Sequence, residues 1–62
     1  MTDTQIITAA YQDALKQVFS VFFTSSAGAA GNAAAIQQAE QAFVAGVTLA
    51  RSARDRAIAL LP

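Results

Sequence analysis

The chain has 62 residues, no net charge, and a composition that is 55% hydrophobic but only 13% charged. It contains no cysteine and no histidine. Disulfides are therefore excluded and the usual ligands of zinc and haem are missing, so we expect no metal and no cofactor. Four basic residues are balanced by four acidic ones, whereas a nucleic-acid binder needs an excess of lysine and arginine to neutralise phosphates.

The small size of the chain limits the core that it can build alone. A domain of this length buries only about 60% of the surface that its unfolded form exposes. Small domains compensate with disulfides, a metal or oligomerisation, and the composition leaves only the last of these. The low charge also predicts that much of the surface faces other protein rather than water, because about a quarter of the residues in ordinary proteins are charged.

The first predicted helix runs from about residue 4 to residue 24. Thr2, Asp3 or Thr4 is suited to cap its N-terminus. Polar residues recur at steps of three and four and form one narrow stripe: Gln5, Thr8, Gln12, Lys16, Ser20 and Thr24. Nearly all other positions are apolar, which is a wider arc than a helix on the surface of a monomer needs. We therefore expect this helix to touch more than one neighbour.

A loop is predicted over residues 25–32, between the two helices. Gly28 is suited to a left-handed C-terminal cap, and Gly31 gives the turn its freedom. Asn32 is a strong N-terminal cap for the helix that follows. A phosphate-binding loop would need a preceding strand and a lysine, so the glycines indicate a simple helix-to-helix connection.

The second predicted helix runs from about residue 33 to residue 61 and carries a seam with heptad-like spacing. The seam consists of Ile36, Ala39, Phe43, Gly46, Ala50, Ala53, Ala57 and Leu60. Its alternation of three and four residues is typical of left-handed helix packing, and its many small residues favour a close approach of two helices. Val44, Val47, Leu49 and Ile58 lie off the seam and supply a second apolar surface.

Folding the chain about the centre of the predicted loop gives an antiparallel hairpin with a definite register. In this register Lys16 meets Glu40. Asp3 likewise lies beside Arg51 and Arg54, so both contacts join opposite charges. The second predicted helix is the longer one, and its last turns are expected to extend past the first helix and to contact another chain.

The side chains offer little chemistry for catalysis. Without histidine or cysteine, the usual general base and the strongest nucleophile are missing. Lys16 lies on the polar stripe, and Tyr11 reads as an aromatic residue at the edge of the core. The three arginines of residues 51–56 complement the C-terminal end of a helix dipole. We therefore expect no enzyme and no catalytic residues.

Residues 18–23 place apolar groups on nearly every side of the first predicted helix. Such a cluster fits either a membrane-inserting or ligand-binding patch or the centre of an oligomeric core. A helix that lies on a membrane normally carries lysine or arginine along its polar face, and here that face has one lysine, Lys16. The oligomeric core is the favoured interpretation.

These patterns predict an all-α fold, a single antiparallel two-helix hairpin that completes a helical bundle by oligomerisation. The expected function is that of a non-enzymatic, self-associating structural or interaction protein that forms a bundle, ring or filament. The alternatives are an accessory subunit that docks on a different protein and, less favoured, a membrane-active peptide. The predicted oligomer interface consists of Val18, Phe19, Phe22, Ile36, Ala39, Phe43, Gly46, Ala50, Ala53, Ala57 and Leu60.

The sequence gives limited information on location in the cell. The first four residues have no basic segment ahead of an apolar run, as a secretory signal would. No stretch of about 20 apolar residues is present, so no membrane-spanning helix is expected. A cytoplasmic location is favoured, and export by a route without a cleaved signal stays open.

Overall fold

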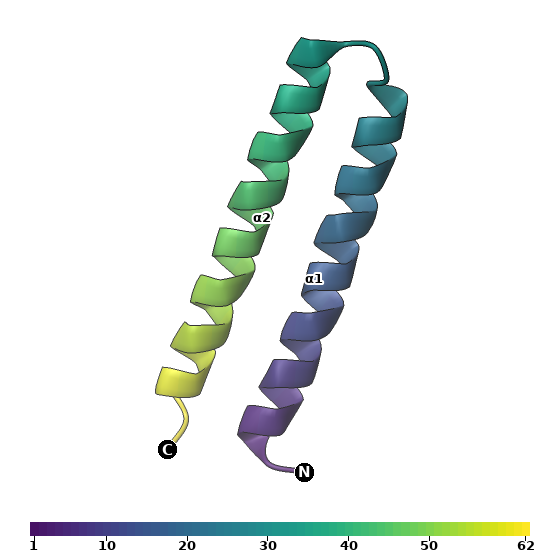
Figure 1. Ribbon diagram of the computed structural model, residues 1–62. Coiled ribbons are helices and arrows are strands. Elements are labelled where there is room, and N and C mark those ends of the chain that lie inside the picture. Colours follow the sequence, from purple (N-terminus) through teal and green to yellow (C-terminus); the bar gives the residue numbers. More distant parts are fainter.

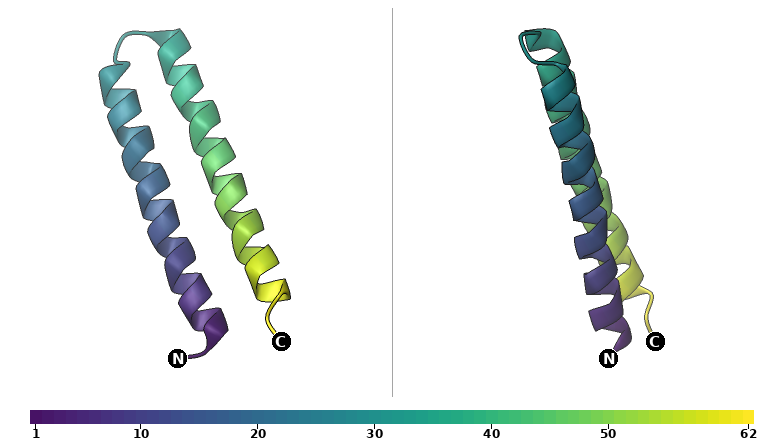
Figure 2. Two further views of the ribbon diagram at one scale, coloured as in Figure 1. Left: turned by 180° about the vertical axis from the view of Figure 1, so that it is seen from behind. Right: turned by 90° about the vertical axis from the view of Figure 1, so that its right-hand side faces the viewer.

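The computed structural model describes residues 1–62 and consists of two helices, α1 (Asp3–Gly28) and α2 (Ala33–Ala59). The helices pack against each other as an antiparallel hairpin, with both termini at the end opposite the connection (Figure 1). The Cα trace measures 49 × 17 × 6 Å, and the edge-on view in Figure 2 shows how thin the molecule is. The all-helical hairpin is confirmed, and by itself it forms a single layer.

Helix α1 begins with a reciprocal capping arrangement. The backbone N–H of Gln5 donates to the Thr2 hydroxyl oxygen at 3.1 Å, and the backbone N–H of Thr2 donates to Gln5 Oε1 at 2.9 Å. Two of the N–H groups that a helix start leaves unpaired are thereby satisfied. Asp3 stands in the first turn, where its negative charge complements the helix dipole.

The end of α1 differs from the prediction, because the helix continues to Gly28 instead of ending near Thr24. The backbone N–H of Ala29 still donates to the carbonyl oxygen of Ser25, at 3.0 Å. Nothing in Ser25, Ser26 or Ala27 forces a helix to stop, since these residues lack the ring of proline. Gly28 is therefore the last helical residue rather than a left-handed cap, and Gly31 is the residue with positive φ, at 83°.

Helix α2 begins after Asn32, whose side-chain Oδ1 accepts a hydrogen bond from the backbone N–H of Ala35 at 3.1 Å. This confirms Asn32 as the N-terminal cap. The helix ends at Ala59, and the N–H of Leu60 closes its last turn on the carbonyl oxygens of Arg56 and Ala57.

The longer first helix shifts the register of the hairpin. Val18 lies against Gly46, and the rings of Phe22 and Phe43 pack with their centroids 4.8 Å apart. The connection is thus centred closer to Gly31 than to the predicted loop centre, and residues near the N-terminus face positions further along α2 than the prediction placed them.

The predicted ion pairs between the helices are absent as a result. Lys16 does not pair with Glu40, and its Nζ lies 3.8 Å from Asp13 Oδ1, one turn earlier in the same helix. Both side chains of this pair are about four-fifths exposed. Such an exposed pair contributes only about 0–1 kcal/mol, so the ion-pair prediction was wrong and its energy was too small to define the register.

The other expected contacts at the open end are corrected in the same way. Asp3 forms no ion pair with Arg51 or Arg54. Helices α1 and α2 have 26 and 27 residues, and in Figure 1 they end at similar levels. The predicted overhang of the second helix is therefore wrong, because α1 is longer than its sequence pattern suggested.

Candidate self-association surface

The hairpin has no hydrophobic core of its own. Only two residues are buried, Ala29 and Ala39, and no large apolar side chain is among them. The accessible surface is 4679 Å², whereas a folded monomer of this mass, 6.4 kDa, is expected to expose about 3,800 Å². The excess of about 900 Å² is close to the roughly 800 Å² that each partner contributes to a standard protein–protein interface.

Large apolar side chains account for much of this exposed surface. Those exposed by half or more are Met1, Ile6, Phe19, Val21, Phe23, Val44, Leu49 and Leu60. Single exposed apolar residues are ordinary on protein surfaces, whereas contiguous patches mark sites of interaction. The distribution of these residues over the two faces of the hairpin therefore matters.

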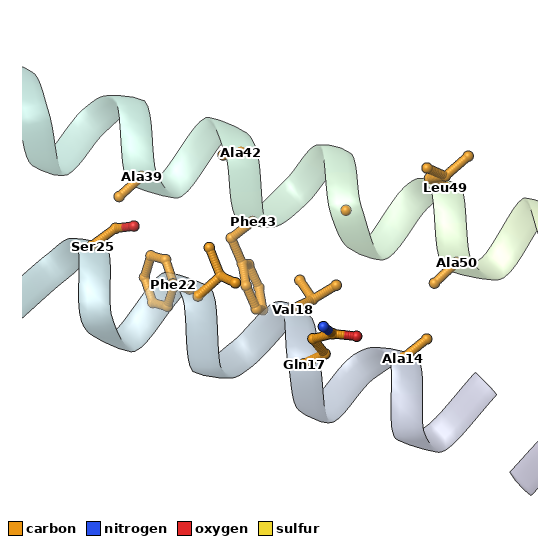
Figure 3. A pocket seen from close by; sticks show the side chains of 12 residues that line it. Ala14, Gln17, Val18, Phe22, Ser25, Ala39, Ala42, Phe43, Leu49 and Ala50 are labelled. Atoms are coloured by element: carbon orange, nitrogen blue, oxygen red, sulfur yellow. The ribbon is translucent and has the colours of Figure 1, made fainter. Parts of the chain in front are cut away.

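Close packing between the helices is concentrated in their loop-proximal halves. A Cβ atom added at Gly46 would lie 3.0 Å from Val18 Cγ1, a distance too short for unstrained contact. The glycine therefore allows α1 to approach α2 closely at this point. Beside it, the Phe22 and Phe43 rings fill the space between the helices, and Figure 3 shows both rings there.

An apolar groove of about 420 Å³ opens on one face of this packed region. Its lining consists of Ala14, Gln17, Val18, Val21, Phe22, Ser25, Ala39, Ala42, Phe43, Gly46, Leu49 and Ala50. None of these side chains is charged, and five of the twelve residues are alanine or glycine. Their small size creates the concavity, and Figure 3 shows the alanine side chains that line it from both helices.

Two phenylalanines form a ridge on the opposite face. Phe19 and Phe23 are 57% and 64% exposed, and their ring centroids lie 6.3 Å apart. Residues two positions apart on an α-helix point about 200° apart. Both phenylalanines stand two positions from Val21, which lines the groove, so they project from the other side of α1. We call this pair the aromatic ridge.

The open end of the hairpin is held by polar side chains. The Arg54 guanidinium lies over the Tyr11 ring, 4.4 Å from its centroid, which is a cation–π geometry. Arg54 Nε also donates to Asp55 Oδ1 at 3.0 Å, and this hydrogen bond raises the pKa of Arg54 above its ordinary value. Arg54 is thus engaged within the hairpin, but with Tyr11 and Asp55 instead of the predicted partner Asp3.

Most of the predicted interface residues lie between the two helices of one chain. Buried or half-buried are Val18, Phe22, Ile36, Ala39, Phe43, Gly46, Ala50 and Ala57. Phe19, Ala53 and Leu60 are instead exposed. Beyond Ala50 the residues that face α1 include 54, 57 and 61. The predicted heptad seam named Ala53 and Leu60 instead, each one residue before the position that faces inward. Contact of any of these residues with another chain stays a prediction.

The predicted interface omitted half of the groove lining, namely Ala14, Gln17, Val21, Ser25, Ala42 and Leu49. The available signal was the apolar spacing of α1, in which Ala14, Val18 and Val21 follow at steps of four and three. The face on which these residues open depends on the register of the hairpin, and the predicted register was wrong.

Comparisons with known proteins give no family for this chain, because no family model, no curated protein and no solved structure matches it. Neither helix is long and apolar enough to cross a membrane. The features on which a function can be argued are those of the hairpin itself, with an apolar groove on one face and an aromatic ridge on the other.

Proposed function

We propose that this chain is a non-enzymatic structural or interaction protein whose hairpins self-associate to complete a shared hydrophobic core. The observation that carries the proposal is the complete lack of buried large side chains in the isolated hairpin. Stable domains bury the apolar face of each layer against another layer, and the single layer described above has no second layer. A second copy of the same chain supplies one.

The charge of the chain supports association between identical copies. The net charge is zero, so identical copies do not repel one another over long distances. The groove is lined without charged residues, and its two most polar side chains are Gln17 and Ser25. Burial of these uncharged groups costs much less than burial of a charge.

A dimer that forms a four-helix bundle is the smallest assembly that would cover one face of the hairpin. Apolar side chains on both faces favour a larger ring or filament, because a dimer through one face leaves the other in water. The same surface would also serve an accessory subunit that docks on a different protein. That second function predicts an isolated chain that is monomeric or insoluble without its partner.

The deciding measurement is the mass of the untagged chain by light scattering across a concentration series, with circular dichroism to follow helicity. A discrete helical dimer or tetramer, or larger regular species that electron microscopy resolves as rings or filaments, supports self-association. A stably folded monomer over the whole series contradicts it. Dye leakage from lipid vesicles, without assembly in solution, would favour the membrane-active alternative instead.

A further inference from the structure

The two faces of the hairpin differ in shape as well as in composition. One face is concave, since the groove is floored by small residues such as Ala39, Gly46 and Ala50. The other face is convex at the same level, because the rings of Phe19 and Phe23 project from it. Protein interiors pack at high density without large voids, so an interface is expected to match a projection with a hollow.

A contact between two like faces would cover either the groove or the aromatic ridge of each copy, but not both. Two grooves placed face to face would have only the exposed Val21 and Leu49 side chains to fill both hollows, and would leave the Phe19 and Phe23 rings of both copies in water. Two ridges placed face to face would hold the flanking surfaces apart. A symmetric dimer through the ridge would also leave Val21 and Leu49 in water, where they are 60% and 70% exposed.

We propose that the aromatic ridge of one copy inserts into the apolar groove of a second copy, so that each chain both donates a ridge and receives one. This inference rests on the proposed self-association and specifies its geometry. A contact between two different faces is heterologous, and it continues from copy to copy until it closes into a ring or extends as a filament.

The positions of the two features along the hairpin fit this stacking. The ridge spans residues 19–23, and the α1 wall of the groove spans residues 14–25. One copy can therefore lie over the next with little shift along the helix axes. Phe19 and Phe23 then meet Val18, Val21 and Phe22 of the neighbour, which are apolar and carry no charge.

The first test uses one variant that lacks the ridge and one in which the groove is blocked. The ridge variant is Phe19→Ser with Phe23→Ser. The groove variant is Ala42→Glu with Leu49→Glu, at exposed positions of the groove lining. The matched control, Ala45→Glu with Ser52→Glu, adds the same charges at the same spacing on exposed positions outside the groove lining.

The expected result is complementation. Each variant alone remains monomeric at concentrations where the wild type and the control assemble, and an equimolar mixture forms a 1:1 complex that does not grow. Self-association of the groove variant alone would show a ridge-to-ridge contact and overturn the proposal. Self-association of the ridge variant alone, or a mixture that stays monomeric, would overturn it as well. A monomeric wild type would instead refute the underlying self-association.

A second test keeps the apolar surface nearly intact and so avoids variants that fail to fold. The chain has no cysteine, and Val44 and Ala42 stand two positions apart on α2, so their side chains point to opposite faces. Under oxidation the double variant Val44→Cys with Ala42→Cys should form a ladder of disulfide-linked oligomers, while Val44→Cys alone should not dimerise. Efficient dimerisation of Val44→Cys by itself, or the absence of a ladder in an assembled sample, would overturn the proposal.

Discussion

The loop-proximal half of the hairpin and its open half are held together by different means. Near the loop, Gly46 lets Val18 approach closely and the Phe22 and Phe43 rings pack between the helices. Near the termini, the main specific contact is the Arg54 guanidinium over a tyrosine ring. The first arrangement depends on shape and tolerates little change in volume, whereas a long, partly exposed arginine can adjust its position.

The proposed self-association surface lies mainly in the loop-proximal half. The aromatic ridge and most of the groove belong to the closely packed half. The open half carries the charged residues Arg51, Arg54, Asp55 and Arg56. Substitutions in the two halves should therefore have distinct effects on stability and on assembly.

The largest effect is expected for Gly46→Leu. The new side chain would collide with Val18, since even a Cβ atom would lie 3.0 Å from Cγ1 of that residue. Overpacking of this kind typically costs about 1–3 kcal/mol, and we expect a lower melting temperature together with loss of assembly. Ala45→Leu introduces the same side chain at an exposed position of α2 outside the groove lining and serves as the control. Wild-type assembly of Gly46→Leu would show that the close approach at Val18 is not required.

A smaller effect confined to the open half is expected for Arg54→Ala. The variant removes the contact with the Tyr11 ring and the hydrogen bond to Asp55, so the ends of the helices should fray. Amide hydrogen exchange should quicken near residues 3–11 and 54–59 while the loop-proximal half and the assembled mass stay unchanged. Arg56→Ala, which removes an exposed arginine from the same turns, is the control. An equal loss of protection from hydrogen exchange in both halves would refute the claim that the two halves are held by separate contacts.

The two loop glycines are expected to respond in opposite directions to alanine. Gly31 has φ of 83°, a conformation that costs an L-residue roughly 1 kcal/mol, so Gly31→Ala should lower stability by about that amount. Gly28 is helical and has nothing within 4 Å of an added Cβ, so Gly28→Ala should raise stability by about 0.5–1 kcal/mol. Thermal unfolding of the two variants measures the difference, and a destabilised Gly28→Ala would contradict the observed end of α1.

An effect of similar size is expected from a hydroxyl at the loop end of α1. Ser26 Oγ is buried and forms no hydrogen bond, and alanine has the higher helix propensity. Ser26→Ala should therefore raise stability by about 1 kcal/mol. Ser20→Ala, at an exposed position of the same helix, should gain only the propensity difference. Equal melting temperatures for the two variants would show that the unpaired Ser26 hydroxyl does not lower the stability.

Local sequence patterns predicted the elements of the fold well. The capping potential of Thr2 and Asn32 and the helical periodicity on either side of the loop are properties of short segments. The end of α1 was missed because Ser25, Ser26 and Ala27 are compatible with both a helix and a loop. Their conformation therefore depends on the positions of the two helices relative to each other.

The candidate surface was predicted in part. Phe22, Phe43 and Gly46 were recognised as packing residues, and the structure places all three at the contact between the helices. The register had been derived from the centre of the predicted loop, which lay too early because α1 continues to Gly28. The charge pairs that agreed with it, such as Lys16 with Glu40, are too weak at an exposed position to compete with the fit of side chains. An error in the register changes which residues are expected to face the other helix and which are expected on the outer faces. Neither the groove nor the aromatic ridge could therefore be located from the pattern alone.

The sequence by itself determined that this chain forms two helices and lacks enough internal contacts to bury their apolar residues, because both follow from periodicity, capping and length. Only the tertiary structure decided which residues turn inward and which face outward. Each residue adds a rotation of about 100° around a helix, but the starting orientation is set by contacts between the helices. Here those contacts are Val18 against Gly46 and Phe22 against Phe43, and they leave the groove and the aromatic ridge on opposite faces.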